Sequence, residues 1–325
     1  MSAGLEILFV IDPLEALILE TETSLLLMSE AARRGHAPWI TYLRELHLQD
    51  STARTRARPI SIDESVRPFY RLGPAEDRAV DSFDVVLMRK DPPVDVDYHN
   101  ALAILARARE RVPVLNDPVG MCRSNEKLLP LEIPGAAPPS VVTADPEVAA
   151  AFVRQHGDVV VKPLNEYSGH GIRRVRVPES AFDSGILESL AAQPGRHVLL
   201  QRFLPEVESG DKRVLVLDGE ALGWVNRVPR PGSFYANIHQ GAVVESTELT
   251  ERERELIGSA GPLLAERGLE MTGFDFIGGW LTEINFTSPS ALRQIDQVMK
   301  NRLETRVVDY LERRAAEGVR QPLPV

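Results

Sequence analysis

The amino-acid sequence predicts an α/β fold that is divided into two or three subdomains. In the first third of the chain, short apolar runs typical of strands alternate with longer segments typical of helices, which favours a layered sheet with largely parallel strands. Further strand-like runs follow from residue 159 onward. The length of 325 residues exceeds the roughly 250–300 residues at which a single core stops growing.

The composition is that of an acidic globular protein. Apolar residues make up 43% of the chain and charged residues 26%, which supports a packed core. The net charge of −10 argues against nucleic acid or an anionic membrane as the main partner. Cys122 is the single cysteine, so no intramolecular disulfide can form. The start of the chain lacks a signal-peptide pattern, and no apolar run is long enough to span a membrane. We therefore expect a cytoplasmic location.

The first third is expected to form the parallel layer. In order, we predict a strand over residues 7–11, a helix over 24–34, strands over 38–42 and 85–88, a helix over 98–111 and a strand over 112–115. The arginine-bearing stretch 51–67 is predicted to be a solvated, hairpin-like excursion.

The rest of the chain begins with a proline-rich boundary at residues 131–140. Strands are predicted over residues 159–161, 172–177 and 198–200. A further α/β or α+β region is expected from Lys212 to about Glu312.

Asp275, Glu283 and Asn285 form a candidate metal site. Glu283 and Asn285 are two residues apart on a predicted strand and therefore point to the same face. Asp275 stands between two phenylalanines, where an uncompensated carboxylate is costly. Such oxygens suit Mg²⁺, which shares its shell with waters and substrate phosphates. The alternative is that Glu283 and Asn285 form the solvated face of an antiparallel strand.

The turn before Glu283 decides whether Asp275 joins the other two residues. With a plain two-residue Gly278-Gly279 loop, Asp275 would pair with Thr282 and face away from Glu283. Convergence requires an odd residue count or a bulge, as a three-residue loop with a left-handed glycine would provide, and we predict that geometry.

Two lysines and a glycine-bearing loop are candidates for phosphate binding. Lys162 ends an apolar strand and precedes Pro163, so its ammonium emerges at the strand end. Gly169 and Gly171 would let backbone N–H groups approach phosphate, although any tight hairpin would use such glycines. Lys127 is either a second phosphate ligand or an ordinary exposed lysine.

An extended segment and several arginines complete the candidates. Residues 201–205 follow an apolar strand and would present backbone groups to a purine edge. Arg213, Arg227 and Arg293 carry planar guanidinium groups suited to phosphate or carboxylate. Each of these arginines, taken singly, is more often a solvated surface charge.

Five motifs together resemble the bacterial glutathione synthetase family of ATP-grasp ligases, and their order and spacing cover nearly the whole chain. The motifs are Asn125-Glu126-Lys127-Leu128, Val161-Lys162-Pro163-Leu164, Gly210-Asp211-Lys212-Arg213-Val214-Leu215-Val216, Met88-Arg89-Lys90-Asp91-Pro92-Pro93 and Leu281-Thr282-Glu283-Ile284-Asn285-Phe286-Thr287-Ser288-Pro289. The last two are specific to this branch of the ATP-grasp ligases.

The resemblance implies an ATP-grasp fold with an N-terminal Rossmann-like domain. It implies a substrate domain over residues 1–124, a central lid over 125–203, a catalytic domain over 204–316 and a tail over 317–325. ATP would be clamped between two antiparallel sheets. The family commonly forms homo-oligomers.

The resemblance also implies a role for individual side chains. The implied assignments are Lys127, Lys162, Gly169 and Gly171 at the ATP phosphates, Gln201 with the backbone of Phe203 and Leu204 at the adenine, Asp211 as a further cofactor-binding residue, Asp275, Glu283 and Asn285 at two Mg²⁺ ions that Mn²⁺ can replace, Arg213 and Arg227 at the transferred phosphoryl group, and Arg89, Asn237 and Arg293 at the substrates.

The implied reaction joins γ-glutamylcysteine to glycine and converts ATP to ADP and phosphate. A carboxylate is a poor electrophile, so ATP first phosphorylates it and the amine then attacks the acyl phosphate. Such catalysis depends on positioning and electrostatic stabilisation, and it needs no nucleophilic side chain.

Two loops depart from the family pattern. Residues 165–171 read Asn-Glu-Tyr-Ser-Gly-His-Gly, where the family has a loop of the form Asp-Gly-Met-Gly-Gly. Gly241-Ala242-Val243 replaces a Gly-Gly-Arg triplet, so an arginine that would face phosphate or substrate is missing. Two alternatives therefore stay open: an ATP-grasp ligase for another amino acid or peptide pair, and a non-catalytic ATP-binding regulatory protein.

Overall fold

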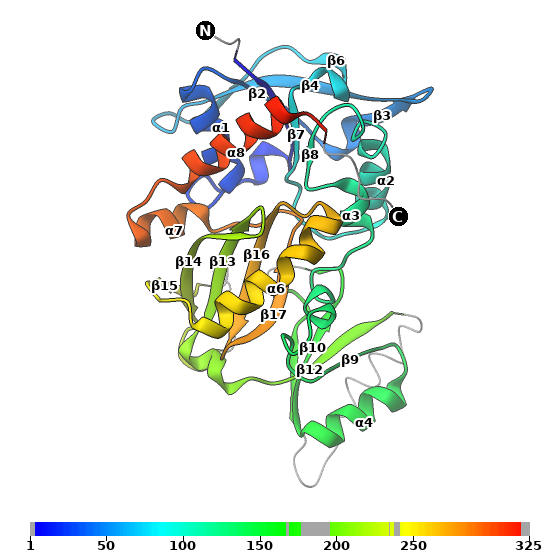
Figure 1. The fold of residues 1–325 in the computed structure, drawn as a ribbon, viewed down its shortest axis with the longest axis vertical. Helices are drawn as coiled ribbons and strands as arrows, with labels where there is room; N and C mark the ends of the chain where they lie inside the picture. The colour runs from blue at the N-terminus through cyan, green and yellow to red at the C-terminus, as the bar shows by residue number, and fades with distance from the viewer. Residues whose placement is uncertain (1–3, 167–168, 177–195, 234, 237–240, 320–325) are drawn as a thin grey trace.

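The described part of the chain forms three β-sheets arranged along the longest axis of the molecule (Figure 1). The computed structural model describes residues 4–166, 169–176, 196–233, 235–236 and 241–319. In Figure 1 the N-terminal sheet lies at the top, a five-stranded sheet in the middle and a four-stranded sheet at the bottom. The four-stranded sheet comes second in the sequence, so the chain runs to the far end of the molecule and then returns.

The N-terminal sheet has a parallel centre with helices on both faces. Its strand order is β3-β4-β2-β1-β7-β8, and β5 and β6 also pair with β4. On β1, Ile7 and Phe9 belong to the same core as helix α1, whereas Leu8 and Val10 belong to the core that contains α2. Coverage of both faces explains why this strand is a continuous apolar run. The bounds are β1 (Glu6–Val10), α1 (Thr23–Arg33), β2 (Ala37–Thr41), β3 (Leu46–Gln49), β4 (Thr52–Ile62), β5 (Tyr70–Leu72), β6 (Glu76–Ala79), β7 (Val85–Met88), α2 (Val96–Leu105) and β8 (Val114–Leu115).

Two details of the sequence prediction for this region were wrong. The helix expected over residues 98–111 ends at Leu105, and turns follow it. The stretch expected to be a solvated excursion is the long strand β4, which pairs with four other strands. Ala53, Thr55 and Ala57 are at most 1% exposed, while the arginines between them point outward. The missed signal was the alternation of small and basic residues, which has the period of a strand.

The four-stranded sheet is antiparallel, in the order β11-β10-β12-β9, with α4 packed on it. Sequence reasoning did not identify β9 and α4. The start of α4 did carry a signal: the Asp145 side chain accepts a hydrogen bond from Glu147 N at 2.8 Å, and Pro146 occupies the first helical position. The bounds are β9 (Ser140–Thr143), α4 (Pro146–His156), β10 (Asp158–Pro163), β11 (Arg173–Arg176) and β12 (Val198–Arg202).

The five-stranded sheet is also antiparallel, in the order β15-β14-β13-β16-β17. Helix α6 covers one face, where Leu256 and Ile257 share a core with Val214 and Phe274. A reciprocal cap between Thr250 and Glu253 begins this helix. The bounds are β13 (Asp211–Leu217), β14 (Glu220–Val228), β15 (Val243–Glu245), α6 (Glu251–Arg267), β16 (Met271–Ile277) and β17 (Trp280–Asn285).

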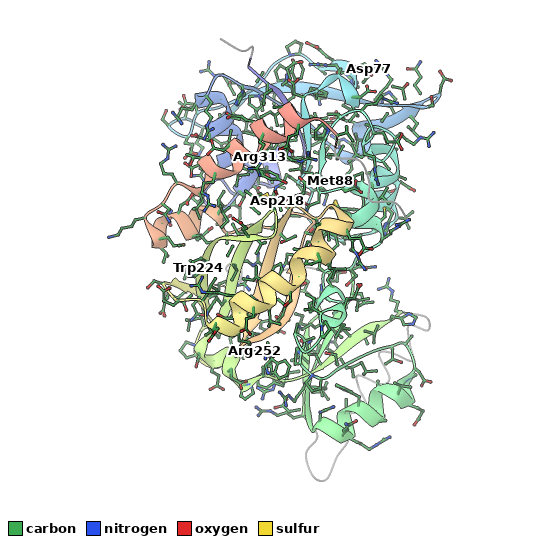
Figure 2. The ribbon with its side chains drawn as sticks, viewed as in Figure 1. Asp77, Met88, Asp218, Trp224, Arg252 and Arg313 are labelled. Carbon is green, nitrogen blue, oxygen red and sulfur yellow. The ribbon has the colours of Figure 1, made fainter. Side chains whose placement is uncertain are left out.

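The C-terminal helices return to the N-terminal sheet (Figure 1). Helix α8 lies beside α1, and Arg34 Nη2 donates to the Thr305 carbonyl oxygen at 2.8 Å. On the same helix, Arg313 Nη2 is 3.4 Å from Asp218 Oδ2 at the turn between β13 and β14, and both residues are labelled in Figure 2. Helix α8 therefore joins the N-terminal sheet to the five-stranded sheet. The remaining bounds are η1 (Leu14–Ala16), η2 (Leu43–Glu45), η3 (Val80–Ser82), α3 (Pro118–Cys122), η4 (Leu129–Glu132), η5 (Pro205–Ser209), α7 (Leu292–Met299) and α8 (Leu303–Glu317).

A membrane-spanning helix requires about 20 consecutive apolar residues. Within the part of the chain that the structure describes, no helix is both long and apolar enough to meet that requirement.

Candidate active site

The hairpin between β16 and β17 brings the three candidate metal ligands to one face. Asp275 is paired directly with Glu283, because a bulge at Thr282 shifts the register between Asp275 and Phe276. The predicted shared face is confirmed, and it arises from a bulge, one of the two geometries that the parity argument allowed. The three-residue loop given as the form of that geometry is not present. The loop is the two-residue Gly278-Gly279 turn, with φ of 56° and 77°, as a type I′ turn requires.

Asp275 is held by arginines from two other strands. Its Oδ1 accepts from Arg213 Nε at 2.5 Å and its Oδ2 from Arg213 Nη2 at 2.8 Å, while Arg227 Nη2 lies 2.9 Å from Oδ1. The register explains the first contact, because Arg213 lies directly opposite Asp275. Burial alone would raise the pKa of Asp275, but the charges of Arg213 and Arg227 outweigh it and hold the pKa at about 2. These three side chains thus form a buried ionic cluster.

Asp211 extends this cluster. It lies opposite Arg227 on the neighbouring strand, and its Oδ2 is 2.7 Å from Arg227 Nη2. Burial and the charge of Asp275 together raise the pKa of Asp211 to about 6, although the charge of Arg227 opposes this shift. Among the described residues, Asp211 Oδ1 has no hydrogen-bond partner. The cluster therefore retains one buried acceptor that a ligand would satisfy.

Glu283 is paired with Lys127, which comes from the segment between the first and second sheets. Lys127 Nζ is 3.1 Å from Glu283 Oε1 and also donates to the Glu166 carbonyl oxygen. Lys127 is only 4% exposed, so it is not an ordinary surface lysine. A buried ammonium between a carboxylate and a loop carbonyl is well placed to exchange these partners for a phosphate.

The oxygen donors fit a hard divalent cation that keeps part of its shell for water or phosphate. Asn285 Nδ2 donates to Asp275 Oδ2 at 3.0 Å and to the Gly273 carbonyl oxygen at 3.2 Å, which leaves Asn285 Oδ1 as an acceptor. No group of three or more His, Cys, Asp or Glu that could hold a metal was found among the residues that the structure describes. Two carboxylates and one amide would therefore need further oxygen ligands from outside the protein.

Lys162 lies on β10 beside the nucleotide-binding candidate Gln201. Lys162 Nζ donates to Gln201 Oε1 at 2.9 Å, and Gln201 Nε2 donates to Ser140 Oγ at 3.1 Å. Burial lowers the pKa of Lys162, while the charge of Glu283 opposes this shift. Lys162 and Lys127 thus both interact electrostatically with Glu283, although they come from different parts of the fold.

The backbone candidates lie at opposite ends of β10. Phe203 N donates to the Asp158 carbonyl oxygen at 3.0 Å, and the Leu204 carbonyl oxygen accepts from Val207 N at 3.1 Å. In the loop after β10, Gly169 and Gly171 have φ of 79° and 71°, a conformation that favours glycine. Glycine is therefore favoured at these two positions because the backbone there is left-handed.

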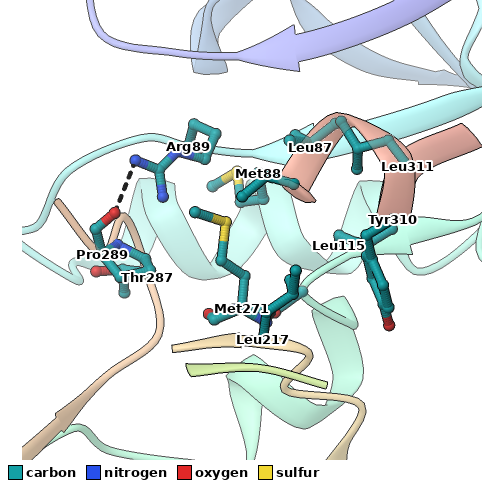
Figure 3. A pocket seen from close by; sticks show the side chains of 12 residues that line it. Leu87, Met88, Arg89, Leu115, Leu217, Met271, Thr287, Pro289, Tyr310 and Leu311 are labelled. Atoms are coloured by element: carbon teal, nitrogen blue, oxygen red, sulfur yellow. Dashed lines mark hydrogen bonds between the residues drawn. The ribbon is translucent and has the colours of Figure 1, made fainter. Parts of the chain in front are cut away.

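Arg89 is buried between the N-terminal sheet and the loop after β17. It is 4% exposed, its Nε donates to Ser24 Oγ at 3.1 Å, and its Nη2 donates to the Pro289 carbonyl oxygen at 3.0 Å (Figure 3). Burial lowers the pKa of Arg89. Its Nη1 has no hydrogen-bond partner in the described part of the chain. A buried guanidinium with an unmet donor is suited to an anionic ligand.

The structure does not bring Arg293 and Arg89 into the lining of the cleft around Asp275 and Glu283. Arg293 Nη2 pairs with Glu64 Oε1 at 2.5 Å. Asn237 lies outside the described residues.

Sequence reasoning missed two acidic side chains that face the same cleft. Glu22, which caps the start of α1, and Asp91, which follows β7, line it together with Arg213 and Arg227. Burial and the charge of Glu22 raise the pKa of Asp91 to about 6. Asp91 stands within a motif that the resemblance already used, and that position was the available signal.

Sequence reasoning also missed that Glu126 belongs to the cleft. It lines the cleft and is 7% exposed. Its position beside Lys127 was the only sequence signal.

Two family models match the chain. The model described as "Prokaryotic glutathione synthetase, N-terminal domain" matches residues 5–121. The model described as "Prokaryotic glutathione synthetase, ATP-grasp domain" matches residues 126–300. Together they cover the N-terminal sheet and both antiparallel sheets.

Relatives align along almost the full length. A glutathione synthetase from Thermosynechococcus vestitus is 35% identical over 318 residues, covering 94% of this chain and 99% of the relative. One from Gloeobacter violaceus is 38% identical over 313 residues, covering 94% and 96%. The solved structure of the ATP-grasp ligase PsnB, complexed with a phosphomimetic variant of a minimal precursor, Mg and ADP, superposes with a TM-score of 0.62 at 18% identity, covering 97% of this chain and 100% of PsnB. The last similarity concerns the fold.

Proposed function

The chain belongs to the prokaryotic glutathione synthetase family, and we propose that it joins γ-glutamylcysteine to glycine with consumption of ATP. It is an ATP-grasp carboxylate-amine ligase, a class of enzyme that uses ATP and a divalent metal ion. One observation carries the proposal: the buried cluster of Arg213, Arg227 and Asp275 lies in one cleft with Glu283. Phosphoryl transfer needs such fixed cations beside metal-binding carboxylates.

The individual roles are part of the proposal. Lys127 and Lys162 would bind ATP phosphates. Lys127 is buried beside Glu283 and already contacts the glycine-bearing loop through Glu166, and Lys162 is a partly buried cation that is also influenced by the charge of Glu283. The remaining proposed nucleotide contacts are Gly169, Gly171, Gln201, Phe203, Leu204 and Asp211. For Phe203 the proposed contact is its carbonyl group, since its N–H is bonded to Asp158.

The metal site is proposed at Asp275, Glu283 and Asn285, with two Mg²⁺ ions that Mn²⁺ can replace. The metal would supply neutralisation of phosphate charge when bound. The protein's part is to hold these oxygens on one face of the hairpin, which the bulge at Thr282 achieves.

Arg213 and Arg227 would stabilise the negative charge on the phosphoryl group during transfer to the substrate carboxylate. The ADP oxygen leaves as the carboxylate oxygen bonds to phosphorus, and the amine of glycine then displaces phosphate from the acyl carbon and releases its proton. Neither step requires a nucleophilic side chain. Arg89, Asn237 and Arg293 are proposed to bind substrate; the unmet donor on Arg89 supports a carboxylate ligand.

The domain assignment also remains a proposal: substrate domain 1–124, lid 125–203, catalytic domain 204–316 and tail 317–325. We further propose a cytoplasmic homo-oligomer that acts on small peptides and amino acids, without nucleic acid or membrane as a partner. The acidic net charge of −10 supports the last point.

A different acid and amine pair is the second candidate. Val243 stands where the family has the arginine of its Gly-Gly-Arg triplet, and it is an apolar side chain that is 57% exposed. Loss of that guanidinium would alter the contacts to substrate or phosphate rather than the chemistry of ligation.

The test is incubation with Mg-ATP, γ-glutamylcysteine and a panel of amines, with product mass and phosphate release measured together. Condensation with glycine supports the first candidate, and selective condensation with another amine supports the second. ATP binding without amine-dependent phosphate release would indicate a regulatory protein and contradict both.

A matched variant tests the metal assignment. Glu283→Gln keeps the shape of the side chain and an oxygen for Lys127, so the fold should stay intact, while turnover should fall by about 100-fold or more because a charged ligand is lost. Unchanged turnover would contradict the assignment of Glu283 to the metal.

A further inference from the structure

Glu126 is a buried carboxylate that none of the assignments above uses. Its Oε1 accepts hydrogen bonds from Phe286 N at 2.7 Å, Thr287 N at 2.9 Å and Thr287 Oγ1 at 2.9 Å. Burial raises the pKa of Glu126, and the charge of Glu283 raises it further. A carboxylate in such a place is costly unless its hydrogen bonds are well formed. Here the donors belong to the chain that immediately follows β17.

The main chain of Glu126 binds the same strand. Ile284 N donates to the Glu126 carbonyl oxygen at 2.9 Å. Ile284 lies between Glu283 and Asn285 in the sequence, and Phe286 follows Asn285. Glu126 is therefore bonded to the backbone on both sides of Asn285.

The neighbours of Glu126 connect this strand to the second sheet. Asn125 Nδ2 donates to the Leu164 carbonyl oxygen at 3.1 Å, two residues after Lys162. Lys127 Nζ contacts both Glu283 and the Glu166 carbonyl oxygen. Three consecutive residues thus join the segment at the end of β10 to β17. Glu126 provides the backbone contacts to β17 and the residues after it, and Lys127 provides the ion pair with Glu283.

We propose that Glu126 is a positioning residue for the metal site. It holds residues 284–287 so that Glu283 and Asn285 present their oxygens at a fixed separation, and it touches neither metal nor nucleotide itself. The inference rests on the proposed function, because it takes Glu283 and Asn285 as ligands. Loss of a partner that orients a metal ligand typically weakens metal affinity by about 10–100-fold.

The test is Mn²⁺ affinity in the presence of ADP, measured from the electron paramagnetic resonance signal of free Mn²⁺. We expect Glu126→Ala to weaken Mn²⁺ binding by about 10-fold or more. Glu126→Gln keeps an oxygen for the three donors, so it should recover most of the affinity. Thr287→Val removes one donor only and should shift the affinity in the same direction by less, which keeps the test decisive if Glu126→Ala does not fold.

A second readout separates positioning from general destabilisation. In turnover assays, Glu126→Ala should raise the metal concentration needed for half-maximal rate, while the KM for γ-glutamylcysteine stays near that of the unaltered protein. Glu253→Ala is the matched control. Glu253 is 4% exposed and accepts from Thr250 N at 2.8 Å and Lys212 Nζ at 2.6 Å, but it lies on α6. It should lower the melting temperature and leave Mn²⁺ affinity unchanged.

The outcomes are distinguishable. If Glu126→Ala and Thr287→Val bind Mn²⁺ like the unaltered protein, or if Glu253→Ala weakens binding equally, the positioning role is wrong. If the unaltered protein and Glu283→Gln bind Mn²⁺ equally, the proposed metal site is wrong and the role of Glu126 fails with it.

Discussion

The two faces of the five-stranded sheet carry opposite kinds of side chain on the same strands. On β13 and β16, Val214 and Phe274 are 0% exposed and pack with α6. The adjacent residues Arg213 and Asp275 are nearly as buried, at 6% and 4%, yet they form an ion pair that faces the cleft. Burial by itself therefore does not distinguish a core from a site. The difference is that apolar burial is favourable unaided, whereas each buried charge depends on its partner.

The largest expected effect comes from removing the carboxylate that both arginines share. Asp275→Ala leaves Arg213 and Arg227 as buried charges without that partner, so the free energy of unfolding should fall by about 3–5 kcal/mol. Denaturant titration measures this change. The isosteric Asp275→Asn should lower the free energy of unfolding by less, because its amide oxygen still accepts hydrogen bonds. Equal stability of Asp275→Ala and the unaltered protein would show that the charged face is not held together by this pair.

Neighbouring residues on one strand give the sharpest comparison of the two faces. Arg213→Gln should lower turnover by about 100-fold, because the fixed charge proposed to stabilise the transferred phosphoryl group is lost. Lys212→Gln, one residue earlier, removes a cation that pairs with Glu253 of α6 and should leave kcat nearly unchanged. Steady-state kinetics with saturating ATP decides the matter. Similar losses of kcat in both variants would mean that a charge on the cleft face contributes no more to turnover than a charge on the face covered by α6.

The apolar face should respond only in stability. Val214→Ala removes two buried carbon atoms and leaves a small cavity, which should lower the free energy of unfolding by about 2 kcal/mol. The metal dependence of turnover should not change. A shifted metal requirement in this variant would indicate that the two faces are mechanically coupled through the sheet.

The pH dependence of stability should originate from the charged face. The pKa of Asp211 is raised from 3.8 to about 6, so the folded protein holds this proton more tightly than the unfolded chain does. The contribution is therefore present below the unfolded pKa and is lost as pH rises toward 6. For metal-free protein, stability measured from pH 4 to 6 should fall less in Asp211→Asn than in the unaltered chain. The opposite difference would contradict the raised pKa.

Local patterns in the sequence were sufficient for much of the fold. Strands β1, β2 and β7 were predicted within one residue of their bounds, because a strand buried on both faces is a continuous apolar run. By contrast, β4 was missed. Its side chains alternate between small and basic, which has the period of a strand but lacks the apolar run of a strand buried on both faces. Its place in the sheet is given by its pairing with four other strands.

The candidate metal site shows the same limit of prediction from local sequence patterns. Parity required a bulge or an odd loop if Asp275 and Glu283 were to share a face, and that requirement follows from the sequence alone. The position of the bulge does not, because Thr282 has no partner in the strand register and is held instead by the hydrogen bond from its Oγ1 to the Asp275 carbonyl oxygen at 3.1 Å.

The sequence by itself determined the family, the alternation that separates the two sheet faces, and the residue types that suit a nucleotide and a metal. Only the tertiary structure decided which charges meet: Lys127 with Glu283, Arg227 with Asp275, and Glu126 with the backbone beyond Asn285. The physical reason is that the periodicity of a strand is a local property of its backbone. The partner of a buried charge is instead determined by desolvation and by segments distant in the sequence, which for Glu126 and Phe286 are 160 residues apart.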